Sequence, residues 1–106
     1  MFTRALKLAP AMLLMLFGTS RGDESHIVIK DFMFMPMAMA VPLGSTVTWD
    51  NEDGEPHTVV SLDGAFRSQG LDEKDHFSHQ FNQAGTFKYI CSIHPKMIGT
   101  ITVTAK

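Results

Sequence analysis

The feature that most constrains the fold is a set of short segments in which apolar and polar residues alternate. In each segment alternate residues are mostly apolar, and these apolar positions are rich in the β-branched and aromatic residues that β-strands prefer. These segments span residues 26–30, 46–50, 77–81, 87–91 and 101–105. Turn-forming residues, such as Asp63-Gly64 and Ala84-Gly85, separate them. After the first 22 residues, no stretch has helical periodicity over ten or more residues. The spacing therefore predicts an all-β sandwich or barrel of about seven to eight strands.

The length of the chain and its single cysteine limit how such a fold can be stabilised. The chain has 106 residues, enough for one domain. A domain of this size buries only about 60% of its unfolded surface, so it is marginally stable without a further staple. One cysteine cannot form an intramolecular disulfide, a Cys-rich zinc fold or an iron–sulfur site. A bound metal is the natural supplement, since binding only to the native state adds to its stability.

The charge composition excludes two broad classes of protein. The net formal charge is −2 and 19% of the residues are charged. These values argue against a basic nucleic-acid-binding protein and against a disordered acidic tail.

Residues 1–22 have the pattern of a secretory signal peptide. Arg4 and Lys7 are basic, residues 8–17 form an apolar run, and small residues follow from Gly18. The apolar run is shorter than the roughly 20 residues that span a membrane. A retained anchor and a structural segment are the alternatives. We expect cleavage, no membrane span afterwards, a mature domain over residues 23–106 and a periplasmic or secreted location.

The end of the predicted strand 87–91 gathers unusual donor atoms. Cys91, His94 and Met97 follow one another at intervals of three residues, and His57 lies far upstream. A buried inert cysteine is the alternative. Thiolate and thioether are soft ligands that select copper, and zinc does not normally take a thioether. Two imidazoles, a thiolate and a weak axial methionine describe an electron-transfer copper site.

The wider pattern resembles the small blue-copper proteins of the cupredoxin superfamily. The residues that carry the resemblance are Phe32-x-Phe34-x-Pro36, Met39-x-Val41, Gly44-x-x-Val47-x-Trp49, Pro56-His57, Phe77-x-x-x-Phe81 and Gly85-x-Phe87-x-Tyr89-x-Cys91-x-x-His94-Pro95-x-Met97-x-Gly99. They cover nearly all of residues 23–106. The Cys-x-x-His-x-x-Met spacing is most similar to that of the amicyanins, whereas plastocyanin and pseudoazurin have a longer gap between His and Met.

The resemblance implies a Greek-key β-sandwich that binds one type 1 copper at one end and shuttles single electrons without acting as an enzyme. Its copper ligands would be His57, Cys91, His94 and Met97, with His94 at the surface and His57 more deeply held. Two positions depart from the amicyanin pattern. Thr58 stands where an Asn ties the two ligand loops together, and Lys96 stands where an apolar residue is usual.

Two other groups of residues have a functional and a plain interpretation. Asp50, Glu52, Asp53 and Glu55 form either a solvated turn or a patch that steers a cationic partner, such as a c-type cytochrome. A dehydrogenase or oxidase would be the other redox partner, and we expect a monomer. The resemblance implies that Phe32, Phe34, Met39 and Val41 face the core, which leaves Met33 and Met35 outward. The methionines at positions 33, 35, 37 and 39 are either core or gap-filling thioethers or a patch that collects Cu(I). Such a patch would serve the alternative function, a periplasmic copper chaperone or storage protein.

Overall fold

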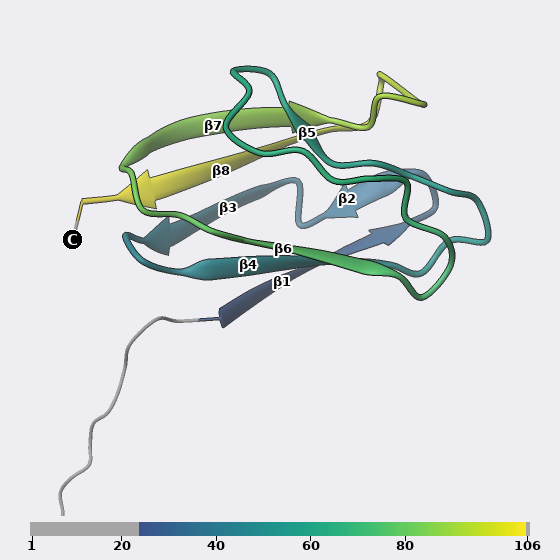
Figure 1. The fold of residues 1–106 in the computed structure, drawn as a ribbon, viewed down its shortest axis with the longest axis horizontal. Helices are drawn as coiled ribbons and strands as arrows, with labels where there is room; N and C mark the ends of the chain where they lie inside the picture. Colours follow the sequence, from purple (N-terminus) through teal and green to yellow (C-terminus); the bar gives the residue numbers. More distant parts are fainter. Residues whose placement is uncertain (1–23, 106) are drawn as a thin grey trace, which may run out of the picture.

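The computed structural model describes residues 24–105, which form eight β-strands in two facing sheets (Figure 1). The strands are β1 (Glu24–Lys30), β2 (Met33–Met35), β3 (Ala38–Pro42), β4 (Thr46–Asn51), β5 (Val60–Ser61), β6 (His76–Gln80), β7 (Gly85–Ile90) and β8 (Ile98–Thr104). No helix occurs between residues 24 and 105, so no helix in that part of the chain could cross a membrane. The predicted signal peptide, residues 1–22, lies outside the described residues.

The two sheets each have four strands and mix parallel with antiparallel pairs. One sheet has the order β2-β1-β4-β6 and the other β3-β8-β7-β5. β1 pairs with β4 and β3 with β8 in parallel, so the chain passes between the sheets rather than forming successive hairpins. This confirms the prediction of an all-β Greek-key sandwich with about seven to eight strands.

The core forms where the inward-facing side chains of the two sheets meet. Trp49 on β4 lies between Ile27 of β1 and Phe77 of β6 in the strand register. From the other sheet, Tyr89 meets the Trp49 ring edge-on, with centroids 5.4 Å apart. Trp49 and Tyr89 are fully buried. Burying an aromatic side chain of this kind contributes about 1.5–3 kcal/mol of folding free energy, so this aromatic layer anchors one sheet to the other.

The structure corrects the expectation that Phe32 belongs to the core. Phe34 and Val41 are buried and Met33 and Met35 face outward, as predicted, but Phe32 is 47% exposed. Phe32 is the second residue of the two-residue turn between β1 and β2, where its φ is 58°. The alternation of a strand does not extend through such a turn, which sends the ring away from the core.

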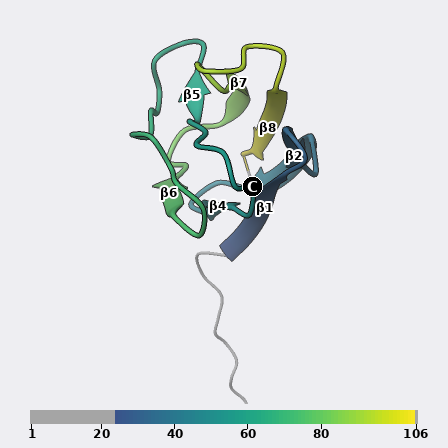
Figure 2. The same ribbon diagram turned by 90° about the vertical axis from the view of Figure 1, so that its right-hand side faces the viewer.

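Three connections meet at one end of the sandwich, the right-hand end in Figure 1, which faces the viewer in Figure 2. They are the β1–β2 turn, the long segment after β4 and the loop between β7 and β8. In one sheet the parallel pairing of β1 and β4 makes the β1–β2 turn and the segment after β4 leave from the same end, and in the other sheet the antiparallel pairing makes β5 and β8 begin at the end where β7 stops. The predicted ligands His57, Cys91, His94 and Met97 all belong to the second and third of these connections.

Gly99, on β8, tests how closely the sheet β3-β8-β7-β5 is packed around the Tyr89 ring. A methyl group at this position would overlap the buried ring of Tyr89, whereas one at Gly70 would meet no atom within 4 Å. We expect Gly99→Ala to lower the free energy of unfolding by about 1–3 kcal/mol through overpacking. Gly70→Ala is the control and should stay within about 0.5 kcal/mol of the parent. Chemical denaturation measures both, and equal effects of the two changes would contradict the packing described here.

Candidate metal centre

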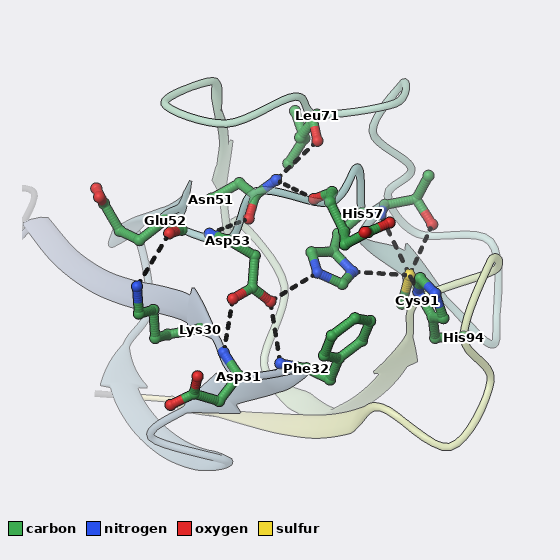
Figure 3. A network of polar contacts seen from close by, with 12 residues as sticks. Lys30, Asp31, Phe32, Asn51, Glu52, Asp53, His57, Leu71, Cys91 and His94 are labelled. Atoms are coloured by element: carbon green, nitrogen blue, oxygen red, sulfur yellow. Dashed lines mark hydrogen bonds and ion pairs between the residues drawn. The ribbon is translucent and has the colours of Figure 1, made fainter.

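The side chains of His57, Cys91 and His94 converge at this end of the molecule (Figure 3). One nitrogen from each ring and the Cys91 Sγ lie within 4.8 Å of one another. The Sγ atom is 3.7 Å from Nδ1 of His57 and 3.8 Å from Nδ1 of His94. Three donor atoms from two distant parts of the chain therefore face a common point.

The loop after β7 is folded by its own backbone hydrogen bonds. The Cys91 amide donates to the Met97 carbonyl at 3.1 Å, and the Met97 amide donates to the His94 carbonyl at 2.9 Å. These bonds return the chain to its starting point within seven residues. Met97 is thereby placed beneath the loop, where it is only 5% exposed.

The donor groups differ in depth, as the sequence predicted. His57 and Cys91 are fully buried, whereas His94 is half-buried. His94 borders a hollow of about 450 Å³ on the surface, which is lined by Phe32, Ile93, His94, Pro95, Lys96 and Met97. Among the described residues, the donor most accessible to solvent is therefore His94.

The surroundings of Cys91 favour the thiolate. The Thr58 amide donates to Sγ at 3.4 Å, and the Thr58 hydroxyl lies 3.8 Å from the same atom. Burial raises the pKa of the Cys91 thiol, but the hydrogen bond from the Thr58 amide, together with the His57 and His94 rings close to Sγ, outweighs it and lowers that pKa to about 6. A thiolate is the form that binds metal.

Thr58 joins the two connections that carry the donors. Its Oγ1 accepts a hydrogen bond from the Ser92 amide at 2.7 Å and lies 2.8 Å from the Ser92 hydroxyl. The hydroxyl thus ties the segment that follows His57 to the loop that follows Cys91. In the described structure Thr58 makes a link of the kind that the resemblance assigns to Asn.

Asp53 is a functional residue that the sequence led us to misplace. As part of an acidic run it was expected in solvent, but it is 8% exposed. Its Oδ2 lies 2.9 Å from Nε2 of His57 and accepts the Phe32 amide at 3.0 Å, while its Oδ1 accepts the Asp31 amide at 2.7 Å (Figure 3). Burial raises the pKa of the Asp53 carboxyl, but these hydrogen bonds and His57 lower it below its usual value. The only sequence signal was its spacing of four residues from His57.

The rest of the acidic run is only partly free to act as a patch. Asp50 lies 3.1 Å from His26, and Glu52 pairs with Lys74 at 3.2 Å. Glu55 alone of the other three is exposed without a side-chain ion pair among the described residues. Both interpretations of the run, a solvated turn and a steering patch, are therefore wrong for Asp53, which is buried.

A match to a protein-family model decides the family. The model is described as a cupredoxin-like domain, and it matches residues 6–103. The chain belongs to the cupredoxin family. Its sequence is 35% identical to amicyanin of Paracoccus denitrificans over 94 residues, which cover 82% of this chain and 72% of that protein. It is 30% identical to amicyanin of Paracoccus versutus over 77% of this chain and 66% of that protein.

Solved structures give the same family assignment. A purple cupredoxin from Nitrosopumilus maritimus is 34% identical, with a TM-score of 0.71 over 76% of this chain and 99% of that chain. The Cu(I) form of an amicyanin variant is 27% identical, with a TM-score of 0.72 over 81% of this chain and 86% of that one. The cupredoxin fold therefore accounts for the described sandwich and for the site at its end.

The spacing of the donor atoms fits a small metal ion. Metal–nitrogen and metal–sulfur bonds of about 2.0 and 2.3 Å, at an angle of about 120°, separate the nitrogen and the sulfur by roughly 3.7 Å. The two Sγ–Nδ1 distances in this cupredoxin are 3.7 and 3.8 Å. An ion with trigonal coordination thus fits these two distances without large movement of the side chains.

The thiol of the metal-free protein should titrate at an unusually low pH. We expect the ultraviolet absorbance of the Cys91 thiolate to rise with a midpoint at pH about 6 in the folded protein. In the chain unfolded by denaturant the midpoint should move close to 9.0, the ordinary value, because the hydrogen bonds to sulfur are lost. Equal midpoints in the folded and unfolded chains would show that the site does not stabilise the thiolate.

Proposed function

We propose that this cupredoxin is a type 1 copper protein that carries single electrons between redox partners. Nδ1 of His57, Sγ of Cys91 and Nδ1 of His94 would hold the metal, and Met97 would be a weak axial ligand. One observation carries the proposal. A thiol and two imidazoles converge within 4.8 Å at the end of the sandwich where the three connections meet. This donor set is the one that distinguishes blue-copper sites from zinc and calcium sites.

Copper bound there would supply a one-electron Cu(II)/Cu(I) couple. The role of the protein is to keep the donors in place in both oxidation states. The Thr58–Ser92 link fixes the two loops relative to each other, and the loop bonds from Cys91 to Met97 and from Met97 to His94 hold the third and fourth donors. Electron transfer is fast when the donors move little as the metal is reduced. These contacts restrict that movement.

The same closure argues against an enzyme. Four protein donors, three of them on buried residues, would fill the coordination sphere of a bound copper and leave no position for a substrate. Catalytic metal sites keep such a position. We propose electron transfer without bond-making chemistry at this centre.

Electrons would enter and leave at the exposed edge of His94. The hollow beside it is bordered by Ile93, Pro95 and Phe32, and Ile93 is 50% exposed. A small apolar surface of this kind suits the brief docking of a redox protein such as a c-type cytochrome, with a dehydrogenase or an oxidase as the other partner. We further propose a monomer, with residues 1–22 as a signal peptide and a periplasmic or secreted location.

Copper storage by the Met-rich segment receives no support from the structure. Met33, Met35 and Met37 are between 40% and 53% exposed, on and beside the edge strand β2. Met39 instead packs against the core. The buried centre does not use any of these four residues, and we do not propose a chaperone or storage function.

The thiolate provides the decisive test of copper binding. The oxidised protein loaded with one equivalent of copper should show an intense visible absorption from a Cys–Cu(II) charge-transfer transition. Cys91→Ser should abolish this band and reversible one-electron cycling, because the hydroxyl is a harder and less basic donor than the thiolate. Met33→Leu is the control and should keep both properties. A colourless wild-type protein that takes up Cu(I) but does not cycle would contradict electron transfer.

Docking at the His94 edge is tested separately. We expect Ile93→Glu to slow the second-order oxidation by a c-type cytochrome about tenfold, because a charge would be desolvated in the apolar contact. The visible spectrum and the reduction potential should stay unchanged. Leu62→Glu changes an apolar residue that is 63% exposed and does not line the hollow, and it should leave the rate unchanged. Equal slowing by both variants would show that the partner does not dock beside His94.

A further inference from the structure

We propose that Asp53 is a positioning residue that fixes His57 and the turn carrying Phe32 as one unit, and that Phe32 is thereby held as a cover over the metal-binding donors. The inference rests on the proposed function, since it explains how this chain keeps its centre in shape and closed to solvent.

The Asp53 carboxylate is built into the protein as an acceptor of three hydrogen bonds. The donors are the Asp31 amide, the Phe32 amide and Nε2 of His57, at 2.7, 3.0 and 2.9 Å. The backbone of Asp53 is fixed as well, because its amide donates to Oδ1 of Asn51 at 2.9 Å. Asn51 is fully buried and donates in turn to the carbonyls of Glu55 and Leu71. Such a carboxylate has little freedom to move.

The contact with Nε2 decides which nitrogen of His57 faces Cys91. An ionised carboxylate only accepts hydrogen bonds, so Nε2 carries the proton that Asp53 binds. In the neutral ring Nδ1 then holds the lone pair, and Nδ1 is the atom that faces Sγ at 3.7 Å. A carboxylate in this position orients a metal-binding histidine and makes it a stronger ligand.

The contacts with the two amides hold an unfavourable turn. Asp31 and Phe32 have φ values of 54° and 58°, in the left-handed region that non-glycine residues rarely occupy. Neither residue is glycine, so the turn needs support from outside its own sequence. The Asp53 carboxylate provides it by binding both consecutive amides of the turn.

The turn places the Phe32 ring directly against the donors. The ring meets His57 edge-on at a centroid distance of 5.3 Å and His94 edge-on at 5.0 Å, with an interplanar angle of 87° in both cases. Phe32 also lines the hollow beside His94 and is 47% exposed. The ring therefore contacts both imidazoles and solvent, and Figure 3 shows it beside the His57 ring.

The first measurement uses the metal-free protein, so it does not depend on copper binding. We expect Phe32→Ala to raise the rate of alkylation of Cys91 by an uncharged reagent at least about tenfold, because it removes the cover. Asp53→Asn should also raise this rate, because the turn loses its anionic acceptor. Glu52→Gln changes the neighbouring carboxylate, which is at the surface, and should leave the rate unchanged. A rate that neither Phe32→Ala nor Asp53→Asn alters would overturn the proposal.

The second measurement separates positioning from a general loss of stability. Nitrogen-15 chemical shifts of the His57 ring in the metal-free protein, followed as the pH is raised until they stop changing, report which nitrogen carries the proton. Wild type and Glu52→Gln should both have the proton on Nε2, and Asp53→Asn should shift the population toward Nδ1. The reduction potential of the copper-loaded Asp53→Asn protein should then differ from that of wild type. An unchanged tautomer in Asp53→Asn would refute the positioning role.

If Asp53→Asn does not fold, Phe32→Ala still tests the cover, and the wild-type ring shifts still test the tautomer. A wild-type ring protonated on Nδ1 would refute the role of Asp53. Loss of the blue band in wild type alone would refute the proposed function instead.

Discussion

The contact between Thr58 and the Cys91–Ser92 pair is the interaction on which the rest of the site depends. It joins a segment that follows β4 to a loop that follows β7, in opposite sheets of the sandwich. Together with the pairing of β5 and β7, it fixes His57, which lies 34 residues before Cys91, relative to the loop that carries Cys91 and His94. The Thr58 amide and hydroxyl supply hydrogen-bond donors to sulfur and a tie between the loops, so one residue serves both the electronic and the mechanical needs of the centre.

The polar arrangement around the centre has a cost that a bound metal would offset. Left-handed backbone at a non-glycine residue costs about 1–2 kcal/mol, and the β1–β2 turn has two such residues in succession. Hydrogen bonds to a charged group contribute about 1.5–3 kcal/mol each, so the two amide bonds to Asp53 are of the size required. The chain has no disulfide to stabilise this end, and metal binding to the native state would add stability at the place where strain and buried polar groups are concentrated.

The alternation of residues was sufficient to predict the fold class, and the donor spacing indicated that His57, Cys91 and His94 would lie close together. Val47, Trp49, Tyr89 and Ile101 fall on inward parities that the sequence alone reveals, and all four are buried. Asp53 and Phe32 were misplaced for a common reason. Each was judged by its local pattern, an acidic run in one case and an alternating strand in the other. Both patterns are interrupted by a contact between segments more than twenty residues apart.

The sequence by itself determined the sandwich, the soft donor set and the loop that carries three of its four members, because periodicity, turn residues and ligand chemistry are local properties. Only the tertiary structure decided which carboxylate supports His57 and which aromatic ring lies against the donors. Those features depend on the parallel pairing of β1 with β4, which brings the β1–β2 turn beside the segment that follows β4. No short-range pattern encodes that pairing, since its partners are brought together by the packing of the whole sandwich.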